Sequence, residues 1–346
     1  MYKKIIFLIF YLFLFTGCMN YTELNELGII ETMGIEKQDD KFLITLNMID
    51  AKSENDESDE LRKYYQATGK NIADAFQNIY LKTSKQIYIS HLETLIISED
   101  ILNKEIEMVI DFFLRNEESR NAFLIVLSKD TLPSDILLEK EQNMEIRDLI
   151  KMNEKEYGIT SLITFEDFAR NVKEEAIDPV IPVIKLDDET IEVDGYAYLK
   201  KKKTAYLTKE ESIIFNILQN KNSKANLSIS NDNLTAKITA INTKYKIDKN
   251  NISFIIDGDI FITENANNLK KDYILKKIKS LINNQINKLV EKSKIDNCDI
   301  LGLTSLIRKT NNSYYQKEKK NLLKKINIDI QTELTIVENP NQKGQS

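Results

Sequence analysis

The sequence contains no tryptophan, one histidine and two cysteines, and only nine glycines and four prolines among its 346 residues. So few histidines and cysteines leave no material for a metal site built from these ligands and only one imidazole for a catalytic triad. The scarcity of glycine and proline excludes collagen-like and linker-like sequences. Basic residues are not in excess either, because 48 lysines and arginines face 54 acidic residues, and the net charge of −6 argues against a dedicated nucleic-acid-binding protein. We expect no metal, no cofactor and no nucleic-acid partner.

Hydrophobic residues make up 42% of the chain, which is enough for the cores of two or three domains. Only one long apolar run occurs, the eleven residues 5–15, and it follows Lys3 and Lys4. A polytopic membrane protein is therefore excluded, and this run is shorter than the roughly 20 residues of a spanning helix. A short positive segment followed by such a run is typical of a secretory signal peptide.

The residues that follow the run end in a cysteine, and Phe15-Thr16-Gly17-Cys18 resembles the lipobox of bacterial lipoproteins. In that motif the cysteine sulfur receives diacylglycerol and becomes the new N-terminus. The alternative is an ordinary cleaved signal peptide with an incidental cysteine. Two acyl chains give durable membrane attachment, whereas one chain binds only marginally. We predict a signal peptide at 1–17, lipidation at Cys18, a mature net charge of −8, and Cys298 as a small buried helix residue and the one remaining thiol.

Apolar periodicity between residues 27 and 127 predicts alternating strands and helices. Two strands separated by the polar stretch 36–41 predict a hairpin, and Asn71 has the side chain of a helix N-cap. The order of the elements indicates an α+β domain with a mixed sheet. The predicted strands are 27–35, 42–48, 87–97 and 123–127, and the predicted helices are 72–80 and 99–115.

Residues 133–176 have a mainly helical pattern, and Pro179 and Pro182 then favour an extended connection or an edge strand. We place a domain boundary there. The whole is thus a multidomain α+β protein with mixed and antiparallel sheets and packed helices. Its predicted parts are an N-terminal α+β region at 18–182, a C-terminal α+β domain at 183–338 and a tail at 339–346.

The C-terminal domain begins with a predicted hairpin at 192–208 that carries Lys200 to Lys203 at its tip. These lysines could touch anionic lipid or simply keep the hairpin solvated. Thr208 and Glu211 have the spacing of a capping box for the next helix. In the final strand, isoleucine and leucine alternate with polar residues, which predicts one buried and one exposed face. The remaining elements are strands at 227–229, 235–247 and 252–262, a long helix at 267–293 and that final strand at 326–336.

The sequence contains no motif for phosphate binding, zinc proteolysis, serine hydrolysis or thiol redox chemistry. His91 lies in the predicted strand 87–97, where alternation places it on the same face as Glu93. A general base is one interpretation of this pair, and hydrogen-bonded packing is the other. Nothing in the sequence requires a catalytic centre, so we do not expect an enzyme.

Several segments, in the same order along the chain, resemble the GerC-type spore germination lipoproteins of endospore-forming Firmicutes. Members of this family begin with a lipidated cysteine, an aromatic residue and, further on, a Gly-Ile-Asp-Lys turn. Here Met19 replaces the aromatic residue and Glu36 replaces the aspartate. The later matching segments are 89–99 with His91, 113–121 with Arg115 and Arg120, 193–200 with Gly195, and 298–303.

The resemblance implies a non-catalytic lipoprotein subunit of a nutrient germinant receptor, anchored at the extracytoplasmic face of the spore inner membrane. Its implied partners are two integral membrane subunits, one of them similar to an amino-acid transporter. His91, Arg115 and Arg120 are candidate interface residues, and local pairing of the arginines with Glu117, Glu118 or other nearby carboxylates is the alternative. A solute-binding lipoprotein of a membrane transporter is the second hypothesis for the function, and a cell-wall hydrolase that uses His91 is the third.

Overall fold

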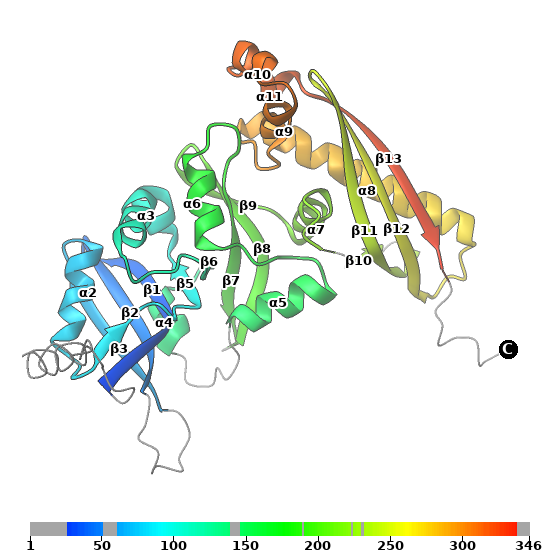
Figure 1. Ribbon diagram of the computed structural model, residues 1–346. Coiled ribbons are helices and arrows are strands. Elements are labelled where there is room, and N and C mark those ends of the chain that lie inside the picture. Colours follow the sequence, from blue (N-terminus) through cyan, green and yellow to red (C-terminus); the bar gives the residue numbers. More distant parts are fainter. Residues whose placement is uncertain are drawn as a thin grey trace, which may run out of the picture.

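The computed structural model describes residues 26–50, 61–138, 146–188, 190–222, 224–229 and 232–337. Within these residues the chain forms two β-sheets with packed helices, which confirms the predicted α+β class (Figure 1). The larger sheet has nine strands in the order β3-β2-β1-β5-β6-β7-β8-β9, and β4 also pairs with β1. Its strands are β1 (Leu27–Gln38), β2 (Lys41–Asp50), β3 (Leu61–Gly69), β4 (Gln86–Tyr88), β5 (Thr94–Ile97), β6 (Leu124–Lys129), β7 (Val180–Asp187), β8 (Thr190–Lys200) and β9 (Lys203–Tyr206).

The first two strands form the predicted hairpin. β1 and β2 pair antiparallel, and the turn residues Asp39 and Asp40 both have positive φ, at 46° and 61°. Two residues in the left-handed region match the twist of the flanking strands, and aspartate tolerates this conformation. The other edge of β1 pairs in parallel with β4 and β5, so β1 lies in the interior of the sheet.

The single strand predicted at 87–97 is wrong. Two short strands, β4 and β5, flank a turn that the N–H of Leu92 closes by donating to the C=O of Ile89 at 3.0 Å. β4 pairs with the start of β1 and β5 with its later half. Between these halves the register of β1 against β2 shifts, at Ile30 and Thr32. Such a bulge bends the strand, so one straight partner strand could not follow both halves.

β7 is an interior strand, so the edge strand predicted around Pro179 and Pro182 is wrong, although the extended conformation is confirmed. β7 pairs in parallel with β6 only from Val183 onward, and it pairs antiparallel with β8 along most of its length. The register with β8 shifts between Pro182 and Ile184. A proline has no N–H to donate to a ladder, and a bulge is where a sheet tolerates it.

The first helix begins where the sequence predicts, whereas the long helix predicted at 267–293 is observed at Lys271–Asp296. α2 (Ile72–Tyr80) starts at Asn71, whose side chain accepts the N–H of Asp74 at 2.8 Å. A π-helical turn, Ile101–Glu105, leads into α3 (Ile106–Arg115). The mainly helical stretch contains α4 (Pro133–Leu138), α5 (Ile146–Glu156) and α6 (Phe165–Lys173).

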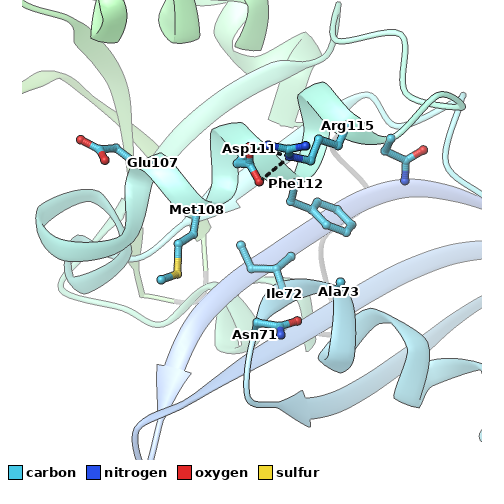
Figure 2. Close-up of a pocket in the computed structure, with 9 residues that line it drawn as sticks. Asn71, Ile72, Ala73, Glu107, Met108, Asp111, Phe112 and Arg115 are labelled. Carbon is cyan, nitrogen blue, oxygen red and sulfur yellow. Dashed lines mark hydrogen bonds and ion pairs between the residues drawn. The ribbon is translucent and has the colours of Figure 1, made fainter.

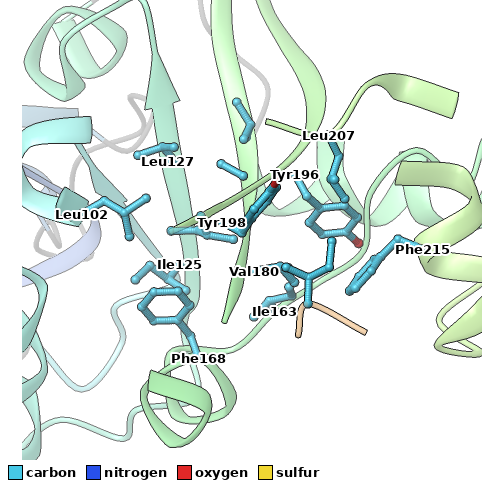
Figure 3. Close-up of a cluster of buried hydrophobic side chains, with 14 of the residues drawn as sticks. Leu102, Ile125, Leu127, Ile163, Phe168, Val180, Tyr196, Tyr198, Leu207 and Phe215 are labelled. Carbon is cyan, nitrogen blue, oxygen red and sulfur yellow. The ribbon is translucent and has the colours of Figure 1, made fainter. Parts of the chain in front are cut away.

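A continuous hydrophobic core joins the sheet to α7 (Lys209–Leu218), which starts with the predicted capping box of Thr208 and Glu211. Figure 3 shows this core between Ile125 of β6 and Phe215 of α7, with the ring of Tyr196 beside Phe215. Tyr196 is fully buried, and its hydroxyl lies 2.7 Å from Ser161 Oγ and donates to Asn216 Oδ1 at 2.7 Å. The hydroxyl of Tyr196 is therefore paired inside this core.

The second sheet has the order β10-β11-β12-β13. The first three strands are antiparallel, whereas β13 is parallel to β12. Parallel strands need a long crossover connection, and here a long helix and three short helices provide it. β13 shows the predicted alternation, with Asp329, Gln331 and Glu333 exposed and the apolar residues partly or fully buried. The elements are β10 (Lys224–Ile229), β11 (Leu234–Asp248), β12 (Asn251–Asn265), α8 (Lys271–Asp296), α9 (Leu303–Thr310), α10 (Asn312–Glu318), α11 (Leu322–Lys325) and β13 (Asn327–Ile336).

The C-terminal end of α8 packs against the larger sheet. Asp296 accepts the hydroxyl of Tyr198 at 2.5 Å and pairs with Lys200 at 2.5 Å, so both partners come from β8. Cys298 is buried as predicted, but it lies after the end of the helix, with Sγ 3.3 Å from the C=O of Leu199.

The buried residue Asp299 holds the start of α9. Its carboxylate accepts the N–H of Leu303 at 2.8 Å and that of Thr304 at 2.7 Å. Its own N–H donates to Asp178 Oδ2 at 2.5 Å, in the connection that leads to β7. Burial raises the pKa of Asp299 to about 6. The two halves of the chain share this contact, and the domain boundary at 182 stays a prediction.

Candidate functional site

The predicted signal peptide at 1–17, the lipidation site Cys18 and the tail at 339–346 lie outside the residues that the structure describes. The lipid anchor therefore stays a prediction. Among the described residues, no helix is long and apolar enough to span a membrane.

His91 lies on the turn between β4 and β5, where its side chain is exposed and its ring centroid is 5.6 Å from that of Tyr88. The expectation that His91 and Glu93 share a strand face is wrong, because the chain is not a strand at these residues. The N–H of Glu93 donates to the C=O of Glu31 at 2.9 Å, and its C=O accepts the N–H of Leu124 at 2.8 Å. The backbone around His91 is thus fixed by the sheet while the imidazole faces solvent.

Arg115 is the last residue of α3, and Arg120 lies in the loop that follows. The Arg115 Nε donates to both carboxylate oxygens of Asp111, at 2.8 and 2.9 Å, one helical turn earlier. The alternative of local pairing with a nearby carboxylate is therefore confirmed for Arg115, although the partner is Asp111 and not Glu117 or Glu118. Arg120 is exposed and has no ion-pair partner within the described part of the chain.

The structure brings the His91 turn and the Arg115–Arg120 loop together. The hydroxyl of Ser90 donates to the C=O of Glu118 at 2.6 Å, which joins the two loops directly. Tyr80, the last residue of α2, lies close by. Burial raises the pKa of Tyr80, and the charge of the neighbouring Glu118 carboxylate raises it further. Two segments that are separated in sequence therefore form one surface beside α2 and α3.

A groove of about 650 Å³ lies between α2 and α3. Figure 2 shows Ile72 at the start of α2 and Phe112 of α3 pointing toward one another, with Met108 beside them and the Asp111–Arg115 pair along α3. Phe112 also packs on Phe76 of α2, with ring centroids 5.8 Å apart. The groove is lined by Asn71, Ile72, Ala73, Glu107, Met108, Asp111, Phe112, Arg115 and Asn116.

The groove combines an apolar floor with a polar rim. Met108 is 53% exposed, although it lies beside two other apolar side chains. On the rim, Glu107 and Asp111 outnumber Arg115, so the local charge is negative. An apolar surface with a charged rim is the usual anatomy of a protein interface. It is suited to binding a partner segment and contains no nucleophile–base arrangement.

The groove is absent from the sequence predictions because α3 has apolar residues on two faces. Ile106, Val109, Ile110 and Phe113 are buried against the fold. Met108 and Phe112, four residues apart, form a second apolar row. This spacing is the signal that could have located the groove.

Other residues in the matching segments have structural roles. The buried carboxylate of Glu36 accepts the N–H and the hydroxyl of Ser134, both at 2.8 Å, at the start of α4, and burial raises the pKa of Glu36. Gly195 has φ +78°, and a Cβ there would lie 2.4 Å from Ser212 Oγ. These residues stabilise the fold. The candidate site therefore consists of the exposed groove and the two loops beside it.

The described residues include no group of three or more His, Cys, Asp or Glu side chains that could hold a metal ion. His91 lies in an exposed turn, and the hydroxyl of the neighbouring Ser90 donates to the C=O of Glu118. The arrangement favours binding.

Two family models match the chain. One, described as "Spore germination protein N-terminal domain", matches residues 20–186, and the other, described as "Spore germination B3/ GerAC like, C-terminal", matches residues 194–339. Spore germination protein KC of Bacillus subtilis (strain 168) is 22% identical over 378 residues, with 92% of this chain and 91% of that protein covered. Spore germination protein GerQC of Bacillus cereus is 21% identical over 357 residues, with 95% and 98% covered. The putative spore germination protein YfkR of Bacillus subtilis (strain 168) is 25% identical over 218 residues, with 57% of this chain and 56% of that protein covered.

The crystal structure of the GerBC protein has a similar fold. The TM-score is 0.57 at 14% sequence identity, with 88% of this chain and 96% of the GerBC chain covered. At this identity the likeness supports the fold alone.

Proposed function

Because the chain belongs to the family of GerAC-like spore germination proteins, we propose that it is a non-catalytic lipoprotein subunit of a nutrient germinant receptor. The observation that carries the proposal is the pair of family matches, together with relatives named as germination proteins over nearly the whole chain. We place the folded part at the outer face of the spore inner membrane, held by acyl chains on Cys18. Two integral membrane subunits are its partners there.

The α2–α3 groove is the docking site that we assign to these partners. Its exposed Met108 and partly buried Phe112 offer apolar area, and Glu107 and Asp111 favour a partner segment that carries a basic residue. The matching loops with His91 and Arg120 lie beside it. The groove is therefore expected to bind a short apolar segment of a membrane subunit, flanked by lysine or arginine.

A pull-down from spore membranes with a tagged chain tests this assignment. Met108→Lys places a charge in the groove and is expected to remove the membrane subunits from the captured material. Met152→Lys is the matched control, because Met152 lies on α5 and is 57% exposed against 53% for Met108. Retention of the membrane subunits by the Met108→Lys chain would overturn the assignment of the groove.

The anchor has its own test. A tether raises the effective concentration of the chain near membrane partners, so Cys18→Ala spores are expected to assemble less receptor and to germinate more slowly in nutrient. If Cys18→Ala spores assemble the full receptor and germinate at the normal rate, the tether has no role.

One observation favours the alternative of a solute-binding lipoprotein. The groove volume of about 650 Å³ falls within the range of small-molecule pockets, about 300–1,000 Å³. That function requires direct nutrient binding by the chain itself. Calorimetric titration of the purified chain with amino acids distinguishes the two, because a receptor subunit that only docks on its partners would give no heat of binding.

A further inference from the structure

Positive charge is concentrated at one end of the fold. Residues 303–325, which contain α9, α10 and α11, have seven basic residues and one acidic residue, so this stretch carries +6 while the rest of the chain carries −12. In Figure 1 these helices stack beyond the C-terminal end of α8. Part of the charge is paired: Arg308 with Glu174 (2.5 Å), Lys319 with Glu175 (2.9 Å) and Lys325 with Glu318 (2.7 Å).

Four lysines of this stretch are exposed and have no carboxylate partner within the described part of the chain: Lys309, Lys317, Lys320 and Lys324. The β8–β9 turn adds the exposed lysines Lys201, Lys202 and Lys203. This turn lies at the same end of the molecule, because the neighbouring Lys200 pairs with Asp296 at the end of α8. We call these seven lysines the lysine-rich end.

An exposed apolar side chain accompanies these charges. Ile295 is 79% exposed, and it precedes Asp296 in the last turn of α8. Exposure of a branched aliphatic side chain to water is unfavourable, and transfer into an apolar environment is favourable. Cations beside a projecting apolar residue are the combination that binds the interface of an anionic membrane.

We infer that the lysine-rich end is a docking surface for an anionic phospholipid membrane, with Ile295 entering the interface. The surface is independent of acylation at Cys18 and would add a second point of contact to it. Outside residues 303–325 and Lys201 to Lys203 the chain has a net charge of −15, which the same membrane repels, so the charge distribution also orients the molecule with this end toward the lipid.

The side chains favour lipid over an acidic protein. All seven unpaired cations are lysines, which act as mobile point charges, whereas paired recognition of carboxylates favours the fixed fork of arginine. They are spread over four short segments and suit a surface of many equivalent headgroups. The nearby Ile295 can insert its apolar side chain into a lipid interface, whereas it would add nothing to an ionic contact with an acidic protein.

A single tryptophan tests the inference, because the chain contains none. The full chain with Ile295→Trp is mixed with vesicles of phosphatidylcholine alone, or of an equal mixture with phosphatidylglycerol. Tyr273→Trp is the matched control, since Tyr273 is exposed near the other end of α8, about 33 Å away at 1.5 Å per residue. Brominated acyl chains then report whether the indole reaches the lipid.

We expect anionic vesicles to shift the emission of the Ile295→Trp chain to shorter wavelength and to allow quenching by the brominated lipid. Neutral vesicles should do neither, salt should reverse the shift, and the Tyr273→Trp chain should not respond. Each lysine contributes about fivefold to binding, so replacing four should weaken it by about 100-fold or more. The four replacements are Lys309→Gln, Lys317→Gln, Lys320→Gln and Lys324→Gln, and the charge-matched control is Lys41→Gln, Lys70→Gln, Lys151→Gln and Lys155→Gln, all exposed.

Three results would overturn the inference. The first is no response of the Ile295→Trp chain to anionic vesicles, and the second is an equal response of the Tyr273→Trp chain. The third is a response that survives the four replacements in the lysine-rich end. If vesicles give no response and those replacements instead remove a membrane subunit from the pull-down, the surface binds an acidic protein and the lipid assignment is wrong.

Discussion

The buried carboxylate of Asp299 should make the free energy of unfolding fall as the pH rises. An ion-paired acid has the opposite effect. Its side chain is 5% exposed and accepts the N–H groups of Leu303 and Thr304 at the start of α9. These hydrogen bonds favour the charged form, but burial outweighs them and raises the pKa from 3.8 to about 6. Asp178 faces the same site, and burial raises its pKa as well.

A folded-state pKa above the unfolded value means that the native state binds the proton more tightly. The resulting stabilisation is complete below the unfolded pKa of Asp299, near 4, and is lost as the pH rises through about 6. A shift of about two pKa units corresponds to about 3 kcal/mol. Asp178 acts in the same direction, so the contact between the two halves of the chain should be strongest in mild acid.

Asp299→Asn removes this titration and keeps one oxygen acceptor for the helix. Between about pH 7.5 and about pH 4.5, the thermal midpoint of the wild type should rise relative to that of the variant by about 5 °C or more, measured by circular dichroism. The exposed Asp248→Asn variant is the control and should parallel the wild type. Parallel midpoints for the wild type and Asp299→Asn across this range would refute the reasoning.

Two further substitutions test the core around β8 by thermal unfolding. Gly195→Ala forces a side chain into φ +78° and toward Ser212 Oγ at 2.4 Å, so we expect a loss of about 2 kcal/mol or more. Tyr196→Phe removes the hydroxyl between Ser161 and Asn216 and leaves buried polar atoms unpaired, which should cost about 1–3 kcal/mol.

Each of these substitutions has a counterpart with the same chemistry and without the strained or buried contact. Gly258→Ala meets its nearest neighbours at 3.2 Å and has no positive φ, so it should cost less than Gly195→Ala. Tyr245→Phe removes a hydroxyl that has no hydrogen-bond partner among the described residues. It should therefore lower the free energy of unfolding by less than Tyr196→Phe does. Equal losses within either pair would contradict the contacts described above.

Local signals in the sequence were reliable. The capping box of Thr208 and Glu211, the N-cap Asn71 and the alternation of β13 depend on residues a few positions apart, and each appears in the structure as expected. The failures involve partners that are distant in sequence. Pro182 is tolerated in an interior strand only because pairing with β6 starts one residue later and the register with β8 shifts there.

β3 was missed because it is only partly apolar and its burial depends on its partners. Its residues include Arg62, Lys63 and Gln66, and its register comes from nine paired positions on β2. The groove was missed for a related reason. Met108 and Phe112 have helical spacing, but only the position of α2 makes them a binding surface rather than a solvated face. The His91 and Arg115 segments were recognised from sequence, and their contact through Ser90 and Glu118 was not.

The interior position of β1 determines how the fold would respond to a pulling force. β1 is the first strand of the described chain, and it is paired with β2 on one edge and with β4 and β5 on the other. A force applied through the residues that precede β1 would have to break the hydrogen bonds of both edges together, in shear. An edge strand would open one bond at a time. Under the proposed anchor at Cys18, the force would therefore act on a strand that resists unzipping.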